Sequence, residues 1–248
     1  MTTQLLRTEN LKVAFDGVTA ANGVDLQIAP HEFVAIIGPN GAGKTTFINL
    51  CTGYVRPSAG SVYLKDRNIT GLSPRAITKM GIARAFQLPQ LFSDHSLLEN
   101  VMMAVAARRG FWHPMTPLDH PRYREEARSL LRLVELERAA EQRSVELSEG
   151  MRKLADIVLA MALKPHLILL DEPTSGVSAS EKFNLMETIV RALRAEKVAA
   201  LFVEHDMEIV RRYADRVLVW NAGRVVAEGK PDSVLNDPYV RENVVGVA

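Results

Sequence analysis

Residues 34–49, VAIIGPNGAGKTTFIN, decide the fold of this 248-residue chain. Four apolar residues predict a short buried strand, a glycine-rich turn follows, and a helix is expected to begin at Lys44. Residues 38–45, GPNGAGKT, match the pattern G-x-x-x-x-G-K-[ST] of a phosphate-binding loop. Glycines let the backbone turn its N–H groups toward phosphate oxygens, and the helix N-terminus adds donors and a positive dipole end. The stretch therefore predicts a nucleoside triphosphate site.

The side chains of this loop suit a magnesium nucleotide. Lys44 supplies a point charge for the β- and γ-phosphates, and the hydroxyl of Thr45 is a hard oxygen ligand for Mg²⁺. The residues of the loop predicted to contact ATP are Gly38, Pro39, Asn40, Gly41, Ala42, Gly43, Lys44, Thr45 and Thr46.

Composition indicates one sizeable globular domain, or one domain that carries an inserted subdomain, because 47% of the residues are hydrophobic and 24% are charged. The net charge of +1 gives no reason to expect bulk binding to nucleic acid. The single cysteine, Cys51, is expected to be buried and free. No apolar run approaches the roughly 18 residues of a spanning helix, so we expect any action at a membrane to go through a partner.

Hydrophobic periodicity predicts an α/β protein. Antiparallel strands are expected at 5–15 and 18–29, and further strands at 61–64, 81–86, 166–170, 199–203, 217–220 and 224–228. Helices are expected at 44–53, 74–80, 97–109, 122–136, 148–163, 178–195 and 206–213. Strand signals fade between about 88 and 147, which indicates a mostly helical insertion.

The predicted architecture is a P-loop NTPase core, a mostly parallel sheet with flanking helices, joined by an antiparallel β subdomain and an inserted helical subdomain. We expect a single unit over residues 1–248, with a core of about 1–87 and 164–248 and an insertion of about 88–163.

Polar residues follow three predicted strands of the core. Residues 167–172, LILLDE, end in Asp171, placed to hold Mg²⁺, and Glu172, a candidate general base for the attacking water. His205 follows the strand at 199–203. Each alone has a simpler interpretation, since many buried strands end in an acid and a lone histidine is usually structural. Their convergence at one edge of the sheet favours contact with a γ-phosphate.

Two further positions had open interpretations. Gln87 follows a predicted strand at the boundary of the insertion, where a glutamine is more often a surface residue than a ligand. Ser148 begins the helix of residues 147–151, LSEGM, as an ordinary N-cap or as part of a second phosphate-binding helix terminus.

The phosphate loop, Gln87, LSEGM, LILLDE and His205, in that order and spacing, resemble the nucleotide-binding subunit of an ABC transporter over essentially the whole chain. In this family two subunits face each other head to tail, and each ATP lies between the phosphate loop of one and the signature helix of the other. The resemblance implies that Ser148, Glu149 and Gly150 serve the nucleotide of the partner.

The same resemblance assigns the remaining roles. Phe15 matches the aromatic residue that stacks on adenine, and His205 matches the histidine on the γ-phosphate. Gln87 matches the glutamine that touches Mg²⁺ and relays to the membrane subunit. The implied metal ligands are Thr45, Gln87 and Asp171, and the implied catalytic residues are Lys44, Glu172 and His205.

Finer features resemble the branched-chain amino acid importer family, which also serves urea, amides and other small carboxylates. Residues 81–104, GIARAFQLPQLFSDHSLLENVMMA, and 202–210, FVEHDMEIV, carry this likeness, and the pattern matches the longer of its two ATPase subunits. The implied partners are two transmembrane permease subunits, docked near 87–97, and a second ATP-binding subunit, paralogous or identical. A periplasmic substrate-binding protein is an indirect partner, and no nucleic acid is implied. The implied location is the cytoplasmic face of the inner membrane.

The signature departs from the common LSGGQ at Glu149 and Met151, and the segment after Glu172 ends in Ser178 where Asp or Asn is usual. We therefore expect a dimer with one weaker composite site. Three alternatives remain: the ATPase of a lipopolysaccharide-export system, a soluble ABC ATPase acting on DNA or ribosomes, and a P-loop kinase. The chain length counts against the second, and the LSEGM helix counts against the third.

Overall fold

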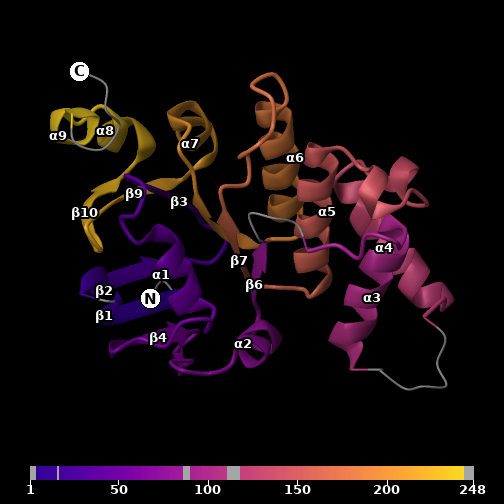
Figure 1. Ribbon diagram of the computed structural model, residues 1–248, viewed down its shortest axis with the longest axis horizontal. Coiled ribbons are helices and arrows are strands. Elements are labelled where there is room, and N and C mark those ends of the chain that lie inside the picture. Colours follow the sequence, from indigo (N-terminus) through magenta and orange to yellow (C-terminus); the bar gives the residue numbers. More distant parts are fainter. Residues whose placement is uncertain (1–3, 16, 86–89, 111–117, 243–248) are drawn as a thin grey trace.

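The computed structural model describes residues 4–15, 17–85, 90–110 and 118–242 (Figure 1). The strands are β1 Leu6–Phe15, β2 Val18–Ile28, β3 Phe33–Ile37, β4 Ala59–Leu64, β5 Arg67–Asn68, β6 Ile82–Ala85, β7 Leu167–Asp171, β8 Ala199–Val203, β9 Arg216–Asn221 and β10 Arg224–Gly229. The helices are α1 Lys44–Cys51, α2 Pro74–Met80, α3 Leu97–Arg109, α4 Pro121–Leu133, α5 Glu149–Ala162, α6 Lys182–Ala195, α7 Met207–Tyr213, α8 Pro231–Leu235 and α9 Pro238–Val240, with 3₁₀ turns at Glu137–Ala139 and Ser144–Glu146.

Two sheets form the scaffold. The six-stranded sheet has the order β10-β9-β3-β8-β7-β6, with every neighbouring pair parallel except β10 with β9. The four-stranded sheet, β2-β1-β4-β5, is antiparallel throughout. The predicted α/β class, with a mostly parallel core sheet and an antiparallel β subdomain, is confirmed.

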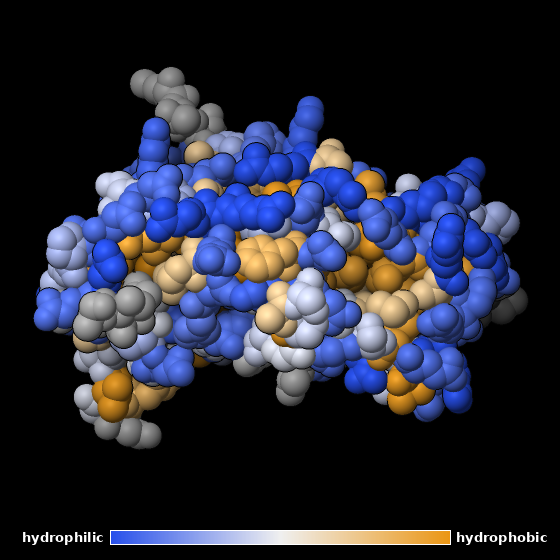
Figure 2. All heavy atoms as spheres, turned by 90° about the horizontal axis from the view of Figure 1, so that it is seen from above, coloured by the Kyte–Doolittle hydropathy of each residue, from blue (hydrophilic) through white to orange (hydrophobic). Residues whose placement is uncertain are grey.

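The central sheet is covered on both faces, as expected for parallel strands that are apolar throughout. All five residues of β3 are buried. Val34 and Ile36 pack with α1 and the antiparallel sheet, whereas Ala35 and Ile37 pack with the helices of the opposite layer. Figure 2 views the molecule from above, and hydrophobic residues are seen there mainly in hollows between hydrophilic ones.

Helices α3, α4 and α5 pack against one another beside the β6 edge of the sheet (Figure 1). Helix α3 begins with a capping box, in which the Ser96 hydroxyl accepts from Glu99 N–H and the Glu99 carboxylate accepts from Ser96 N–H. The helical character predicted for this part is confirmed. The division of the chain into a core and an insertion at about 87 and 163 stays a prediction.

Several predicted boundaries were wrong by a few residues. Helix α6 begins at Lys182 and not at 178, because Ser178 opens a turn in which its carbonyl accepts from the N–H groups of Glu181 and Lys182. Helix α4 covers Pro121–Leu133 and not 122–136, because Glu135 adopts a left-handed φ of 62°. Strand β4 extends back to Ala59, and α1 ends at Cys51. Cys51 is buried as predicted, and burial raises the pKa of its thiol.

Substitutions of Trp220 in β9 test the packing between the two sheets. It is fully buried against Phe47 of α1, with ring centroids 4.9 Å apart, and its indole Nε1 has no hydrogen-bond partner among the described residues. Trp220→Ala should lower the free energy of unfolding by about 3–5 kcal/mol. Trp220→Phe should lose much less, because it also removes an unsatisfied buried donor that costs about 1–3 kcal/mol. Guanidinium chloride unfolding of the two variants measures the difference, and equal losses would contradict this account.

Candidate active site

The candidate site lies where neighbouring strands of the central sheet end together. Strands β3, β8, β7 and β6 are adjacent and parallel, so their carboxyl ends meet at one edge. The phosphate loop follows β3, Glu204 and His205 follow β8, and Glu172 follows β7. The convergence that the sequence predicted for these polar residues is present.

The phosphate loop is shaped by close backbone contact. Gly43 is the N-cap of α1 with a φ of 103°, and no side chain caps the helix N-terminus. A Cβ atom at Gly43 would lie 2.0 Å from the carbonyl oxygen of Ala20 in β2. Glycine is therefore required at this position, and the first N–H groups of α1 remain available for an anion.

The side chain of Lys44 bonds to the backbone of the phosphate loop. Its Nζ donates to the carbonyl oxygens of Gly38 at 2.7 Å and of Pro39 at 2.8 Å. Burial lowers the pKa of Lys44, and the nearby carboxylates Glu172 and Asp171 oppose that shift. The side chain is 6% exposed, so its ammonium group is positioned by the loop and shielded from bulk water.

Asp171 is a buried carboxylate at the end of β7. Its Oδ1 accepts from the Thr45 hydroxyl at 3.3 Å, and its Oδ2 pairs with the Arg84 guanidinium at 3.1 Å. Arg84 also bonds Asn49 of α1. Sequence reasoning missed Arg84, although a charged residue within an otherwise apolar strand was the available signal.

The oxygens of Thr45 and Asp171 fit Mg²⁺, which prefers hard oxygen ligands. Within the described part of the chain, no group of three or more His, Cys, Asp or Glu side chains could hold a metal by itself. This donor set is typical of Mg²⁺ held by one carboxylate together with the oxygens of a bound phosphate.

Glu172 and His205 contact each other although they are 33 residues apart in the sequence. The ring Nε2 of His205 lies 2.9 Å from Oε1 of Glu172, and both side chains are partly exposed. Glu172 has a left-handed φ of 52°, unusual for a residue with a side chain. Its N–H donates to the carbonyl oxygen of Val203 at 3.1 Å, which fixes β7 to the end of β8.

A third carboxylate, Glu204, is buried directly before His205 in the chain. It is 3% exposed, and its Oε1 accepts from the N–H and the hydroxyl of Thr174 at 3.1 and 2.7 Å. Its Oε2 accepts from His205 N–H at 3.1 Å. Burial raises the pKa of Glu204, whereas these hydrogen bonds lower it. This residue, also missed from the sequence, joins the loop after β7 to the loop after β8.

The predicted signature residues lie at the start of α5, away from the phosphate loop in sequence and on exposed surface. Ser148 is the N-cap, and its hydroxyl accepts from Met151 N–H at 3.4 Å. Ser148 and Glu149 are exposed, and a Cβ at Gly150 would meet no atom within 4 Å. The N-capping interpretation is confirmed, and the surface beside Gly150 is open.

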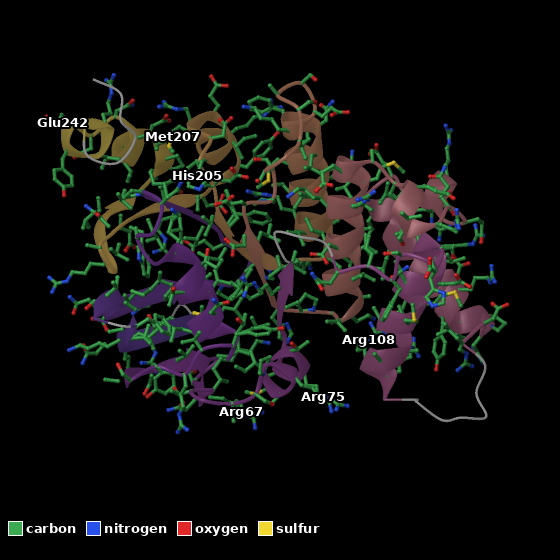
Figure 3. All side chains as sticks on the ribbon, in the orientation of Figure 1. Arg67, Arg75, Arg108, His205, Met207 and Glu242 are labelled. Carbon is green, nitrogen blue, oxygen red and sulfur yellow. The ribbon has the colours of Figure 1, made fainter. Side chains whose placement is uncertain are left out.

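The remaining predicted ligands have different outcomes. Phe15 is 47% exposed at the end of β1, where it pairs with Val18 of β2. Val18 lies two residues before Ala20, whose carbonyl oxygen is close to Gly43 of the phosphate loop. Gln87 lies outside the described residues. Figure 3 shows His205 beside Met207 at α7, on the far side of the molecule from Arg67 and Arg75.

The fold and the site define a P-loop ATPase cassette. A protein-family model described as "ABC transporter" matches residues 21–175 of the sequence. The chain belongs to the ABC transporter family and is one of its ATP-binding ATPase subunits.

Two curated relatives match almost the whole chain. The high-affinity branched-chain amino acid transport ATP-binding protein LivG of Escherichia coli K12 is 33% identical over 100% of both chains. A probable branched-chain amino acid transport ATP-binding protein LivG of Archaeoglobus fulgidus is 34% identical over 98% of this chain and 96% of its own.

Solved structures of ATP-binding cassettes are also similar to this chain. The ATP-binding cassette MJ1267 of an ABC transporter superposes with a TM-score of 0.88 at 31% identity, over 100% of both chains. Its ADP conformation gives a TM-score of 0.86 at 32% identity, over 97% of this chain and 98% of that one. The cassette MJ0796, a dimeric post-hydrolysis state bound to ADP and Pi, gives 0.77 at 26% identity, over 91% of this chain and 98% of that one. Two of these solved cassettes thus hold ADP, and one of them is a dimer.

No helix within the described ranges is both long and apolar enough to cross a membrane.

Two of the three glycines of the phosphate loop, Gly43 and Gly41, give a matched test. Gly43→Ala should weaken ATP binding by roughly tenfold or more, or about 1.4 kcal/mol, because the new Cβ collides with Ala20 O and moves the loop. Gly41→Ala should retain the fold, since no atom lies within 4 Å of its Cβ and only the positive φ of 76° opposes it. Titration with a fluorescent ATP analogue measures both affinities, and equal weakening would contradict the steric argument.

Proposed function

We propose that this chain is the ATP-hydrolysing subunit of a membrane importer for branched-chain amino acids or related small amides and carboxylates. The ATPase mechanism rests on one observation: Lys44, Asp171 and the Glu172–His205 pair lie together where adjacent strands end. The substrate class rests on the names of the full-length relatives.

In this proposal the phosphate loop, residues 38–46, holds ATP, and Phe15 stacks on the adenine. The N–H groups at the start of α1 and the Lys44 ammonium contact the β- and γ-phosphates. Thr45 and Asp171, with Gln87, are the proposed Mg²⁺ ligands, and the ion, when bound, neutralises phosphate charge. Catalysis then depends on positioning and electrostatics, the main contributions in phosphoryl transfer.

Glu172 is the proposed general base. Its carboxylate is partly exposed and contacts His205, so it has both access to water and a fixed orientation. The carboxylate accepts the proton of the attacking water, while His205 contacts the γ-phosphate. The left-handed backbone of Glu172 directs this side chain differently from that of Asp171, which is consistent with separate roles for two consecutive acids.

Two cassettes facing head to tail would complete the sites. Ser148, Glu149 and Gly150 lie on the open start of α5, where the nucleotide of a partner has access. Met151 packs partly against the core in place of the usual glutamine, and the Ser178 hydroxyl bonds Glu181 within its own turn at 2.6 Å. These two residues therefore support the proposed asymmetric dimer with one weaker site.

The proposed membrane partners are two permease subunits at the cytoplasmic face of the inner membrane, with a periplasmic binding protein acting through them. Exposed apolar side chains support docking around residues 87–97, of which 90–97 are described. Tyr54 and Leu72 are exposed on the core side, and Phe92 is 61% exposed on the side of the helical segment. Two permease genes and a binding-protein gene beside the coding sequence would favour this assignment over an export system.

Glu172→Gln tests the general base. We expect the variant to bind ATP normally and to lose roughly 10²–10⁴-fold in kcat, because the amide cannot take a proton from water. Steady-state hydrolysis and size-exclusion chromatography with ATP measure turnover and the accumulated closed dimer. Glu187→Gln, an exposed change on α6, is the matched control. Normal turnover in Glu172→Gln would remove this residue from its role.

Mixing the chain with a paralogous ATPase subunit tests whether its dimer partner is a paralogue or a second copy. ATPase activity should rise sharply when the purified chain is combined with the paralogous ATPase encoded beside it, because each composite site needs a signature helix from the opposite subunit. The rise should depend on Glu172, so the Glu172→Gln chain serves as the control. Activity unchanged by the paralogue would favour a homodimer and the export-type alternative.

A further inference from the structure

Two charged side chains lie buried on α5, outside the proposed ATP site. Lys153 and Asp156 are each 5% exposed, on a helix whose other buried residues are apolar. They are three residues apart and therefore share one face of the helix. Burying charge is unfavourable unless each group gains specific partners, so the partners of this pair show what it holds.

The pair bonds the backbone of two residues, Glu172 directly after β7 and Gln90 further along from β6. Lys153 Nζ donates to the main-chain oxygen of Glu172, directly after β7, at 3.4 Å. Asp156 Oδ1 accepts from the N–H of Gln90, on the segment that follows β6, at 3.3 Å. One face of α5 thus contacts the backbone of both Glu172 and Gln90, and α5 itself packs on β6 (Figure 1).

The space between these groups is small. A cavity of about 10 Å³ is lined by Ala85, Lys153, Asp156, Ile157, Leu170, Asp171 and Pro173. That volume accommodates roughly one water molecule. The interactions of Lys153 and Asp156 are therefore made in a poorly hydrated setting, where hydrogen bonds to charged groups are stronger than in water.

The backbone of Glu172 depends on such anchors. Its left-handed φ of 52° is a conformation that costs of order 1–3 kcal/mol in a residue with a side chain and persists only when neighbours enforce it. Val203 O accepts its N–H, and its carbonyl oxygen accepts from Ser175 N–H at 3.1 Å and from Lys153 Nζ at 3.4 Å. Together these contacts fix the peptide planes on both sides of the Glu172 side chain.

We propose that Lys153 and Asp156 are positioning residues for ATP hydrolysis. From one face of α5, Lys153 bonds the Glu172 carbonyl, which Ser175 N–H also holds, and Asp156 bonds Gln90 N–H, so that movement of α5 relative to the sheet displaces the Glu172 carboxylate. The inference rests on the general-base role proposed for Glu172. It makes α5 the element that couples the helical part of the chain to the timing of hydrolysis within its own subunit.

The first test removes each contact and separates kcat from binding. In Lys153→Met, kcat for ATP hydrolysis should fall roughly tenfold to a hundredfold, the loss expected when a catalytic group is misplaced by about 1 Å. KM and the affinity for a fluorescent ATP analogue should stay within twofold. Asp156→Ala should behave similarly, whereas Asp156→Asn keeps an acceptor for Gln90 N–H and should retain most of kcat. Lys164→Met, an exposed change just beyond α5, is the control.

A double-mutant cycle distinguishes positioning from general destabilisation. In a Glu172→Gln background, Lys153→Met should change the residual rate by less than twofold, because both changes act on the same carboxylate. A purely structural role would instead lower the melting temperature, kcat and ATP affinity together. If Lys153→Met does not fold, Lys153→Gln, with a shorter neutral side chain, takes its place.

Three outcomes would overturn the inference: kcat of Lys153→Met within twofold of the parent, parallel loss of kcat and affinity, or an undiminished effect in the Glu172→Gln background. Glu172→Gln turning over normally would instead reject the proposed base. An inactive Glu172→Gln with a fully active Lys153→Met would reject this inference alone.

Discussion

The end of β8 is the point on which the rest of the site depends. In the parallel register, Val203 pairs with Ile36 of β3 on one side and with Asp171 of β7 on the other. Two backbone hydrogen bonds extend this pairing past the strands, from Glu172 N–H to Val203 O and from Glu204 N–H to Ile36 O, at 3.1 and 3.2 Å. A slip of one residue would turn every side chain to the opposite face. The register of three strands therefore places the phosphate loop, the candidate base and His205 within reach of one another.

Much of this arrangement could be predicted because its signals are local. The phosphate loop is one continuous motif, and the apolar strands before Asp171 and His205 announce where polar residues leave the sheet. The contact between Glu172 and His205 could be expected only as a shared edge, because its 2.9 Å geometry depends on a left-handed backbone that no pattern in LILLDE indicates. The start of α6 was misplaced for a related reason: the side chain of Ser178 competes for the turn that would have begun the helix.

The residues that were missed are charged groups within or directly after apolar strands. Arg84 in β6 and Glu204 after β8 look, in a sequence, like exceptions to a buried pattern. In the structure each satisfies groups supplied by distant segments: Arg84 holds Asp171 and Asn49, and Glu204 holds the Thr174 backbone and hydroxyl. Such partners are separated by 30 residues or more, so only the folded chain reveals them.

The buried charges Lys153 and Asp156 are better explained by the positioning of Glu172 than by a contribution to stability. Replacing buried ionic groups with apolar ones of similar volume is often neutral or stabilising, so an apolar α5 would serve the core at least as well. An apolar α5, however, has no donor for the Glu172 carbonyl and no acceptor for Gln90 N–H. The strained backbone of Glu172 would then keep its hydrogen bonds with Val203 and Ser175 but lose the contact that joins it to α5. On this argument Lys153 and Asp156 serve to direct the Glu172 carboxylate, and the unfavourable burial of two charges is offset by the apolar packing of the rest of α5.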